Sequence, residues 1–260
     1  MIVVVLVVAL VVDASYVTAS ASSAQAFKTA TLLKTLNVNS LITGEVGVGK
    51  KSLARYILPD APMLDASNYD ELLTALSGVN KVIITNLENS PNIKKILEII
   101  YNNNIRVIAT AKSSYYNEFA DKLFSVKFDI PSLRESPEDV EELVQKFIKE
   151  ASLLFCSKEE FKIKNFKPDL SQNSNSLRRQ VMIHYLLQDI NENELIDIFQ
   201  NYLADKLGSN SDYKNFLYLY EVPLIKAGFN KFKSQLQLAD RLGLNRNTLR
   251  KKIADNGKYL

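Results

Sequence analysis

A glycine-rich turn between an apolar and an amphipathic segment limits the fold of this 260-residue chain more than any other feature. The short segment 40–43, with Leu41 and Ile42 at its centre, predicts a strand, and a helix is expected from Lys50 onward. The turn between them contains Gly44, Gly47 and Gly49. With this spacing, backbone N–H groups can surround a phosphate group, and the helix start and the lysine add positive charge. The segment therefore has the order of a P-loop and predicts an α/β fold. A purely structural glycine turn is the alternative.

The residue after the P-loop lysine departs from the usual pattern. A serine or threonine that binds magnesium normally follows the lysine, whereas this chain has Lys51. The sequence therefore predicts ATP or ADP as the ligand and leaves magnesium binding open. The candidate nucleotide-binding residues in the loop are Gly44, Glu45, Gly47, Val48, Gly49, Lys50 and Lys51.

The C-terminal segment carries a second strong pattern. Apolar residues recur at helical spacing over residues 235–242, Gly243 permits a tight turn, and Asn245 is a suitable N-cap for a second helix. In that second helix, Leu249 and Ile253 lie one turn apart and face inward. Two short helices joined in this way are typical of a helix-turn-helix, whose second helix enters the major groove of DNA.

The outer face of this second helix is polar and basic. Arginine suits guanine edges or phosphate, asparagine suits adenine edges, and lysine suits phosphate. Residues 231–260 contain eight Lys or Arg and two Asp, a net charge of +6, although the whole chain carries only +3. A merely solvated basic face is the alternative, but this concentration of charge favours DNA binding. The candidate DNA-binding residues are Asn245, Arg246, Asn247, Thr248, Arg250, Lys251 and Lys252.

The same C-terminal residues resemble a known family. The string over residues 242–253, together with Glu-Val-Pro-Leu-Ile at residues 221–225, closely resembles the Fis-type domain that ends many bacterial enhancer-binding proteins, the NtrC-like activators. The resemblance implies a dimer formed by the helices before the motif, here within residues 213–232. A dimer and a ring both remain open.

Segments downstream of the P-loop extend this resemblance to the AAA+ domain of these activators. Residues 105–111 resemble the sensor I strand, and residues 128–140 resemble the segment that opens the helical lid. Residues 175–180 resemble sensor II, which implies that Arg178 contacts the nucleotide. The resemblance implies an α/β P-loop AAA+ core with a parallel sheet, a helical lid and an all-α C-terminal domain.

Several departures from the family indicate a degenerate scaffold. Where the family has the Asp-Glu pair that acts on magnesium and on the attacking water, this chain has Thr85 and Asn86. Glu88 follows in a segment expected to form a loop, and Lys112 stands at the polar position of sensor I. The sequence contains no Gly-Ala-Phe-Thr-Gly-Ala loop, the family's contact with sigma-54, so that contact is not expected. We therefore assign no catalytic residue, and enzymatic activity stays uncertain.

The expected domain organisation has four parts. These are an apolar N-terminal strand segment (1–19), an AAA+ α/β core (20–132), a helical lid (133–207) and a Fis-type DNA-binding and dimerisation domain (208–260). The apolar run 1–12 is shorter than the roughly 20 residues of a transmembrane helix, and it favours a buried strand over a targeting segment. A single Cys156 and a single His184 argue against disulfides and a Cys/His metal site, which suits a cytoplasmic protein without a membrane partner.

Together these patterns predict a sequence-specific DNA-binding transcriptional regulator on a degenerate AAA+ scaffold, which binds ATP or ADP without hydrolysing it. The alternative function is an ATP-hydrolysing enhancer-binding activator in which Glu88 or another carboxylate replaces the missing acids. A third hypothesis is a protein-interaction module with a non-functional P-loop.

Overall fold

The computed structural model describes residues 16–155, 166–188, 190–232 and 234–260. The apolar strand expected over residues 1–12 lies outside these described residues. The chain divides into two compact units, the first ending at residue 189 and the second comprising Ile190–Leu260.

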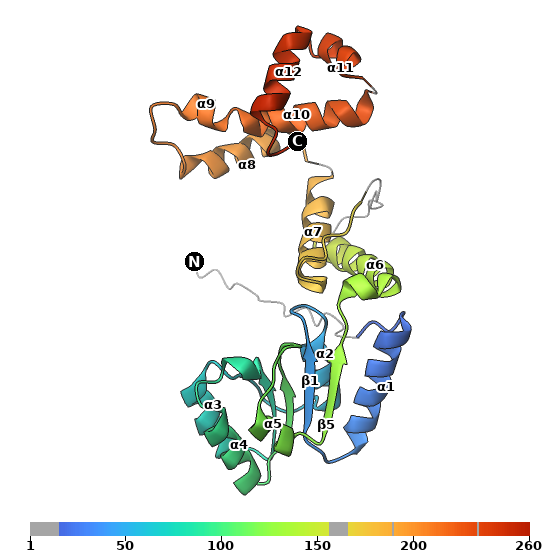
Figure 1. Cartoon of the computed structure of the whole chain (residues 1–260), viewed down its shortest axis with the longest axis vertical. Coiled ribbons are helices and arrows are strands. Elements are labelled where there is room, and N and C mark those ends of the chain that lie inside the picture. Colours follow the sequence, from blue (N-terminus) through green and yellow to red (C-terminus); the bar gives the residue numbers. More distant parts are fainter. Residues whose placement is uncertain (1–15, 156–165, 189, 233) are drawn as a thin grey trace, which may run out of the picture. The chain divides into compact units, whose positions relative to one another are not determined.

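The centre of the first unit is a five-stranded parallel sheet in the order β2-β3-β4-β1-β5 (Figure 1). Its strands are β1 (Ser40–Gly44), β2 (Met63–Asp65), β3 (Lys81–Thr85), β4 (Arg106–Thr110) and β5 (Val126–Ile130). Because all strands run in parallel, their carboxyl ends lie along one edge of the sheet. The loops that follow β1, β3 and β4 therefore meet there, where ligands bind in open α/β sheets.

Alternating side chains of the central strands supply two hydrophobic layers. In β3, Val82 and Ile84 belong to one buried cluster and Ile83 to the other. In β4, Val107 and Ile108 divide in the same way. Because successive side chains of a strand point to opposite faces, both faces of the sheet are buried, as is usual for parallel sheets.

Helices cover both faces of the sheet (Figure 1). On the face of Ile83 lie α1 (Ala21–Thr35) and α2 (Lys50–Ile57). On the opposite face lie α3 (Tyr69–Leu76), α4 (Ile93–Asn102) and α5 (Glu118–Leu123). Short 3-10 turns follow β3 and β5, namely η1 (Leu87–Asn89) and η2 (Leu133–Glu135).

Two helices form the lid of the first unit. They are α6 (Pro137–Leu154) and α7 (Ser174–Leu187). Val144 and Phe147 of α6 pack with Leu177 and Val181 of α7 in a separate hydrophobic cluster. Pro137 occupies the first turn of α6, where a missing backbone N–H costs nothing.

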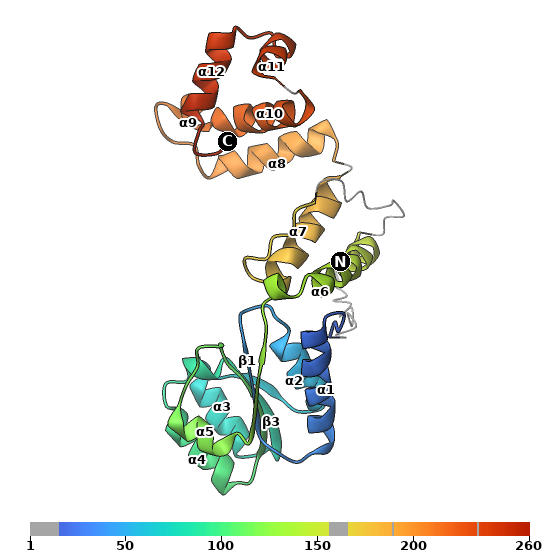
Figure 2. The ribbon, with the colours of Figure 1, turned by 45° about the vertical axis from the view of Figure 1, so that its right-hand side comes forward.

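The second unit is entirely helical (Figure 2). Its helices are α8 (Glu192–Ala204), α9 (Asp212–Phe216), α10 (Tyr218–Lys231), α11 (Gln235–Arg241) and α12 (Arg246–Asp255). Ile225 of α10, Leu238 and Ala239 of α11, and Leu249 of α12 form its buried core.

The expected fold class is confirmed: an α/β P-loop fold with a parallel sheet and helical lid precedes an all-α unit. The division of the chain differs from the sequence-based organisation in one respect. The sequence placed residues 192–204 in the lid, whereas the structure groups α8 with the C-terminal helices. Across the described ranges, every helix is too short or too polar to cross a bilayer.

Candidate phosphate pocket and candidate nucleic-acid interface

The glycine-rich loop connects the end of β1 to the start of α2, in the order that the sequence predicts. Gly47 in this loop has a φ angle of 82°, which few residues other than glycine adopt. A Cβ atom on Gly47 would also lie 2.2 Å from the carbonyl oxygen of Gln172 in the lid. The glycine therefore permits both the turn and the close approach of the lid.

A cavity of about 570 Å³ opens between this loop and the carboxyl ends of β3 and β4. Of the predicted nucleotide-binding residues, Gly47, Gly49, Lys50 and Lys51 line it, whereas Gly44, Glu45, Val48 and Arg178 do not. The complete lining is Val46, Gly47, Gly49, Lys50, Lys51, Ser52, Asn86, Glu88, Asn89, Thr110, Lys112, Ser174 and Asn175.

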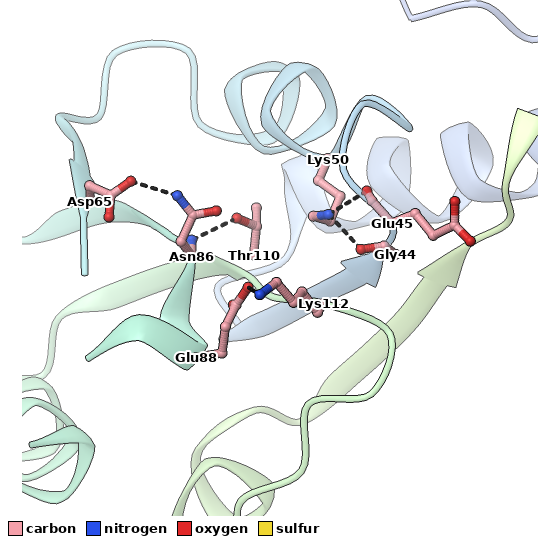
Figure 3. Close-up of polar contacts among 8 residues, drawn as sticks. All are labelled: Gly44, Glu45, Lys50, Asp65, Asn86, Glu88, Thr110 and Lys112. Atoms are coloured by element: carbon pink, nitrogen blue, oxygen red, sulfur yellow. Dashed lines mark hydrogen bonds and ion pairs between the residues drawn. The ribbon is translucent and has the colours of Figure 1, made fainter. Parts of the chain in front are cut away.

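Lys50 bends back over the loop. Its ammonium group donates hydrogen bonds to the carbonyl oxygens of Gly44 and Glu45, each at 2.6 Å (Figure 3). Desolvation lowers the pKa of Lys50, although the negative charges of Glu88 and Asp129 act in the opposite direction. Because the two carbonyl groups are neutral, a phosphate oxygen is a stronger partner for this ammonium group.

The residues that replace the expected acids bind a carboxylate on the neighbouring strand. The Nδ2 atom of Asn86 donates to Oδ2 of Asp65 at 2.6 Å (Figure 3). The Oγ1 atom of Thr85 lies 3.3 Å from the same oxygen. Because a carboxylate only accepts hydrogen bonds, the amide NH₂ of Asn86 must face Asp65, and the amide oxygen faces away from it. Burial raises the pKa of Asp65, but hydrogen bonds from Ser67, Asn86 and Thr85 outweigh this effect and lower it.

The segment after β3 is the 3-10 turn η1 rather than an open loop, and it brings Glu88 into the cavity. Asn86 turns the chain here with a φ angle of 54°. The Oε1 atom of Glu88 lies 3.9 Å from Nζ of Lys112 (Figure 3). The Oε2 atom is buried and has no hydrogen-bond partner. Glu88 is thus a carboxylate in the cavity that the sequence did not expect to lie there.

The loop before α7 binds the P-loop directly. The Nδ2 atom of Asn173 donates to Oε2 of Glu45 and to the carbonyl oxygen of Val46, each at 2.9 Å. The backbone N–H of Ser174 donates to the carbonyl oxygen of Gly47 at 3.1 Å. The side chain of Glu45, predicted to bind nucleotide, instead connects the P-loop to the lid.

Arg178 is held inside the lid. Its Nε atom donates to Oε2 of Glu150 at 3.0 Å, and its guanidinium forms an ion pair with the same carboxylate. These hydrogen bonds raise the pKa of Arg178. The structure therefore does not bring Arg178 together with the predicted P-loop residues.

A second, smaller cavity of about 140 Å³ lies between the P-loop and the lid. The predicted residues Gly47, Val48 and Gly49 line it, together with residues such as Tyr16 that sequence analysis did not single out. The ring of Tyr16 covers Gly49 so closely that a Cβ atom there would lie 2.8 Å from it. Burial raises the pKa of Tyr16 to about 12. Leu143 and Phe147 of α6 add apolar surface to the lining. Among the residues that the structure describes, no cluster of His, Cys, Asp and Glu could hold a metal ion.

Two short helices, α11 and α12, joined by a tight turn form at the residues that the sequence predicts. Gly243 has a φ angle of 63° in the turn, and the Oδ1 atom of Asn245 accepts from the backbone N–H of Asn247 at 2.8 Å, which caps α12. Leu249 is buried against Leu238 and Ala239 of α11. The inward-facing side of α12 is therefore fixed by packing.

The predicted DNA-binding residues separate into two groups. Arg246, Asn247, Thr248, Arg250 and Lys251 are exposed, as is the cap residue Asn245. Lys252, in contrast, forms an ion pair with Glu221 of α10, and Asn256 donates to the same carboxylate at 3.3 Å. The structure thus places the Lys252 ammonium group inside the unit, where it holds α12 against α10.

Helix α8 has no buried residue within the chain. Its apolar side chains nevertheless recur at helical spacing, and the exposed fractions are 62% for Ile196 and 49% for Tyr202. The exposed apolar residues of this helix are Leu195, Ile196, Ile198, Phe199 and Tyr202.

The fold is similar to that of solved P-loop AAA+ structures. NtrX from Brucella abortus in complex with ADP matches with a TM-score of 0.59 and 18% identity, covering 94% of this chain and 69% of the NtrX chain. The complex of the same protein with ATP matches with a TM-score of 0.53 and 17% identity, covering 93% and 69%. Another NtrX structure gives a TM-score of 0.55 at 17% identity, with coverage of 93% and 69%. No protein-family model and no curated protein sequence matches this chain.

Proposed function

We propose that this chain is a sequence-specific DNA-binding transcriptional regulator that binds ATP or ADP on a degenerate AAA+ scaffold. The observation that carries the proposal is the pairing of α11 and α12 around Leu249, with a polar and basic face on the other side of α12. A helix held in this way can enter the major groove with its outer side chains toward the bases.

The exposed residues of α12 have the chemistry of base and phosphate readout. Arg246, Asn247 and Arg250 offer guanidinium and amide groups to base edges, and Lys251 offers an ammonium group to phosphate. Asn245 and Thr248 lie at the start of the helix, where backbone N–H groups also attract phosphate. Lys252 has a supporting role, because it is engaged with Glu221.

The chain binds DNA as a dimer through its C-terminal unit. The exposed apolar side chains of α8 form a surface that a second copy would cover, and Tyr220 of α10, at 66% exposure, is a further exposed apolar residue of this unit. Two copies present two α12 helices to two half-sites, as dimeric helix-turn-helix proteins do. This assignment adds α8 to the dimerising segment that the sequence placed within residues 213–232.

The first unit binds a nucleotide and does not hydrolyse it. The P-loop ends in Lys50, whose present partners are neutral carbonyl groups, and the NtrX structures of similar fold contain ADP or ATP. Hydrolysis needs carboxylates that act on the metal and on the attacking water. Thr85 and Asn86 occupy those positions and bind Asp65. Contact with sigma-54 is not part of this proposal, because the corresponding loop sequence is absent from the chain.

Titration of DNA binding with salt tests the central part of the proposal. Fragments selected by genome-wide mapping of bound sites would be titrated with the full chain at several salt concentrations. The logarithm of the association constant should fall steeply and linearly with the logarithm of salt concentration, because several phosphate contacts release counterions. A flat dependence, or equal affinity for selected and random fragments, would contradict the proposal.

Glu88 favours a second candidate function, an ATP-hydrolysing activator, because its buried Oε2 atom lies at the cavity without a partner. Steady-state phosphate release, measured with and without DNA, separates the two functions. The proposed function predicts background release that Lys50→Ala leaves unchanged. Turnover that is lost in both Lys50→Ala and Glu88→Gln, but not in the surface variant Glu118→Gln, would establish the second function.

A further inference from the structure

We infer that the cavity beside the P-loop binds a nucleoside di- or triphosphate without magnesium, and that Lys51 and Lys112 supply the positive charge that the metal would supply. This inference rests on the nucleotide-binding part of the proposed function and is independent of DNA binding.

The donor set of the cavity does not fit magnesium. Magnesium in such sites is held by oxygen ligands, usually one or two carboxylates together with the phosphates. In P-loop proteins these ligands are the hydroxyl group after the lysine and an acid at the end of the neighbouring strand. Lys51 places an ammonium group at the first position. Thr85 stands at the second, and its hydroxyl group is directed to Asp65. Ser52 and Thr110 add neutral hydroxyl groups to the lining.

Apart from Glu88, whose Oε2 atom has no hydrogen-bond partner, the acidic residues near the cavity are already engaged. The carboxylate of Asp65 accepts from Asn86 and does not line the cavity. Glu45 accepts from Asn173 of the lid, and Asp129 accepts from Thr43 at 2.7 Å. Glu88 is the one carboxylate among the described residues that line the cavity, and its Oε1 atom faces Lys112.

Ammonium groups outnumber carboxylates in the lining. Lys50, Lys51 and Lys112 contribute three positive charges, and Glu88 contributes one negative charge. A divalent cation entering this cavity would meet like charges at short range. A polyphosphate without a bound metal carries its full negative charge, and each ammonium group can form a charge-assisted hydrogen bond with it.

Two of these ammonium groups lie where they can meet a polyphosphate from different sides. Lys51 stands at the first turn of α2, where the helix start also attracts anions. Lys112 follows β4 and approaches the cavity from the end of that strand, beside Glu88 (Figure 3). Lys50 would leave the carbonyl oxygens of Gly44 and Glu45 to join them.

Titration calorimetry with the full chain tests the inference directly. ADP and ATP would each be titrated in buffer containing EDTA and again in excess magnesium. The expected dissociation constant in EDTA is equal to or lower than that in magnesium. Magnesium lowers the concentration of metal-free nucleotide, and the ammonium groups of the cavity repel the magnesium complex. A dissociation constant more than about tenfold higher in EDTA would overturn the inference.

Charge-removing variants identify the groups responsible. Lys112→Met should raise the dissociation constant in EDTA by about tenfold, the effect of losing one charge-assisted hydrogen bond. The matched control is Lys28→Met, an exposed lysine on α1 away from the cavity, which should leave it unchanged. Equal affinities for Lys112→Met and Lys28→Met would exclude the assigned role of Lys112.

A reverse variant tests whether the lysines exclude the metal. The double substitution Lys51→Ser and Lys112→Asn removes two ammonium groups and adds oxygen ligands. Nucleotide binding should then become tighter with magnesium than with EDTA. If nucleotide affinities in EDTA and in magnesium compare as they do in the natural chain, Lys51 and Lys112 are not what excludes magnesium.

Failure of this inference can be distinguished from failure of the proposed function. If neither nucleotide binds in either buffer, both this inference and the nucleotide-binding part of the proposed function are overturned. The DNA titration, carried out on the same preparation, then decides separately whether the regulatory part stands.

Discussion

Asp139 accepts hydrogen bonds from both the backbone N–H and the hydroxyl group of Ser20, at 2.8 and 2.6 Å. The hydroxyl group of Ser23 donates to the same carboxylate. Asp139 lies in the first turn of α6, and Ser20 is the N-cap of α1. One buried carboxylate therefore joins the lid to a helix of the α/β core.

Replacing Asp139 by alanine should destabilise the first unit. The change leaves the buried N–H of Ser20 and two hydroxyl groups without their charged acceptor, which costs about 3 kcal/mol. Urea unfolding followed by circular dichroism would measure the loss. The control is Glu138→Ala, because Glu138 lies in the same turn and is exposed. Equal stability of the two variants would show that the link is not needed.

The effect of Asp65→Asn should depend on pH. Hydrogen bonds lower the pKa of Asp65 in the folded chain, so its carboxylate stabilises the fold above the unfolded pKa of about 3.9. This contribution is lost as the pH falls through the folded pKa. We expect Asp65→Asn to reduce the free energy of unfolding by about 1 kcal/mol at pH 7 and to have no effect well below pH ~4. Urea unfolding across this pH range would check it, and a difference that grows in acid would contradict it.

Arg250→Ala should weaken binding to the preferred DNA site and relax its sequence preference. Loss of a base contact from an exposed arginine of α12 costs about 1–3 kcal/mol. Fluorescence anisotropy with the preferred site and with single-base variants would measure both effects. Lys214→Ala, on the exposed surface of α9, serves as the control and should behave as the natural chain. Unchanged affinity and base preference in Arg250→Ala would show that α12 is not part of the DNA-binding surface.

Two adjacent lysines of α12 should respond differently to replacement. Lys251→Ala should reduce the salt slope of DNA binding by about one without changing the melting temperature, because it removes one phosphate contact. Lys252→Ala should lower the melting temperature, because it leaves the mostly buried carboxylate of Glu221 without its ion pair. Calorimetric melting and the salt titration separate the two roles. The opposite pattern would mean that Lys252 contacts DNA.

Phe199→Asp should convert the proposed dimer into a monomer. A charge on the apolar face of α8 opposes burial against a second copy, and DNA affinity should fall because only one half-site is then bound. Analytical ultracentrifugation would measure the oligomeric state. Asn201→Asp adds the same charge to a polar position of α8 and should leave the dimer intact. A monomeric natural chain would contradict the assignment of this face.

Local patterns in the sequence predicted the parts of the site that depend on neighbouring residues. The order of strand, glycine-rich turn and helix around Lys50 is confirmed, because spacing in the chain determines it. The turn at Gly243 and the cap at Asn245 are confirmed for the same reason. Continuous apolar runs likewise determine that the central parallel strands are buried on both faces.

Contacts between residues that are distant in the sequence could not be predicted from these local patterns. Asp65 reaches Asn86 because β2 and β3 are neighbours in the sheet, and no spacing rule in one sequence gives that pairing. Arg178 was assigned by resemblance, and the structure engages it with Glu150 instead. Lys252 fits a basic recognition face by composition, but Glu221 of another helix binds it. In each case the partner comes from a distant segment.

The tie between Lys252 and Glu221 has a consequence for the architecture of the operator. It joins α12 to α10, so in the proposed dimer the helix that would read the bases is tied to a helix of the proposed dimerising segment. The distance between the two halves of a palindrome would then be a fixed property of the protein. Inserting a single base pair at the centre of such a palindrome, which rotates one half around the duplex, should abolish simultaneous engagement of both halves.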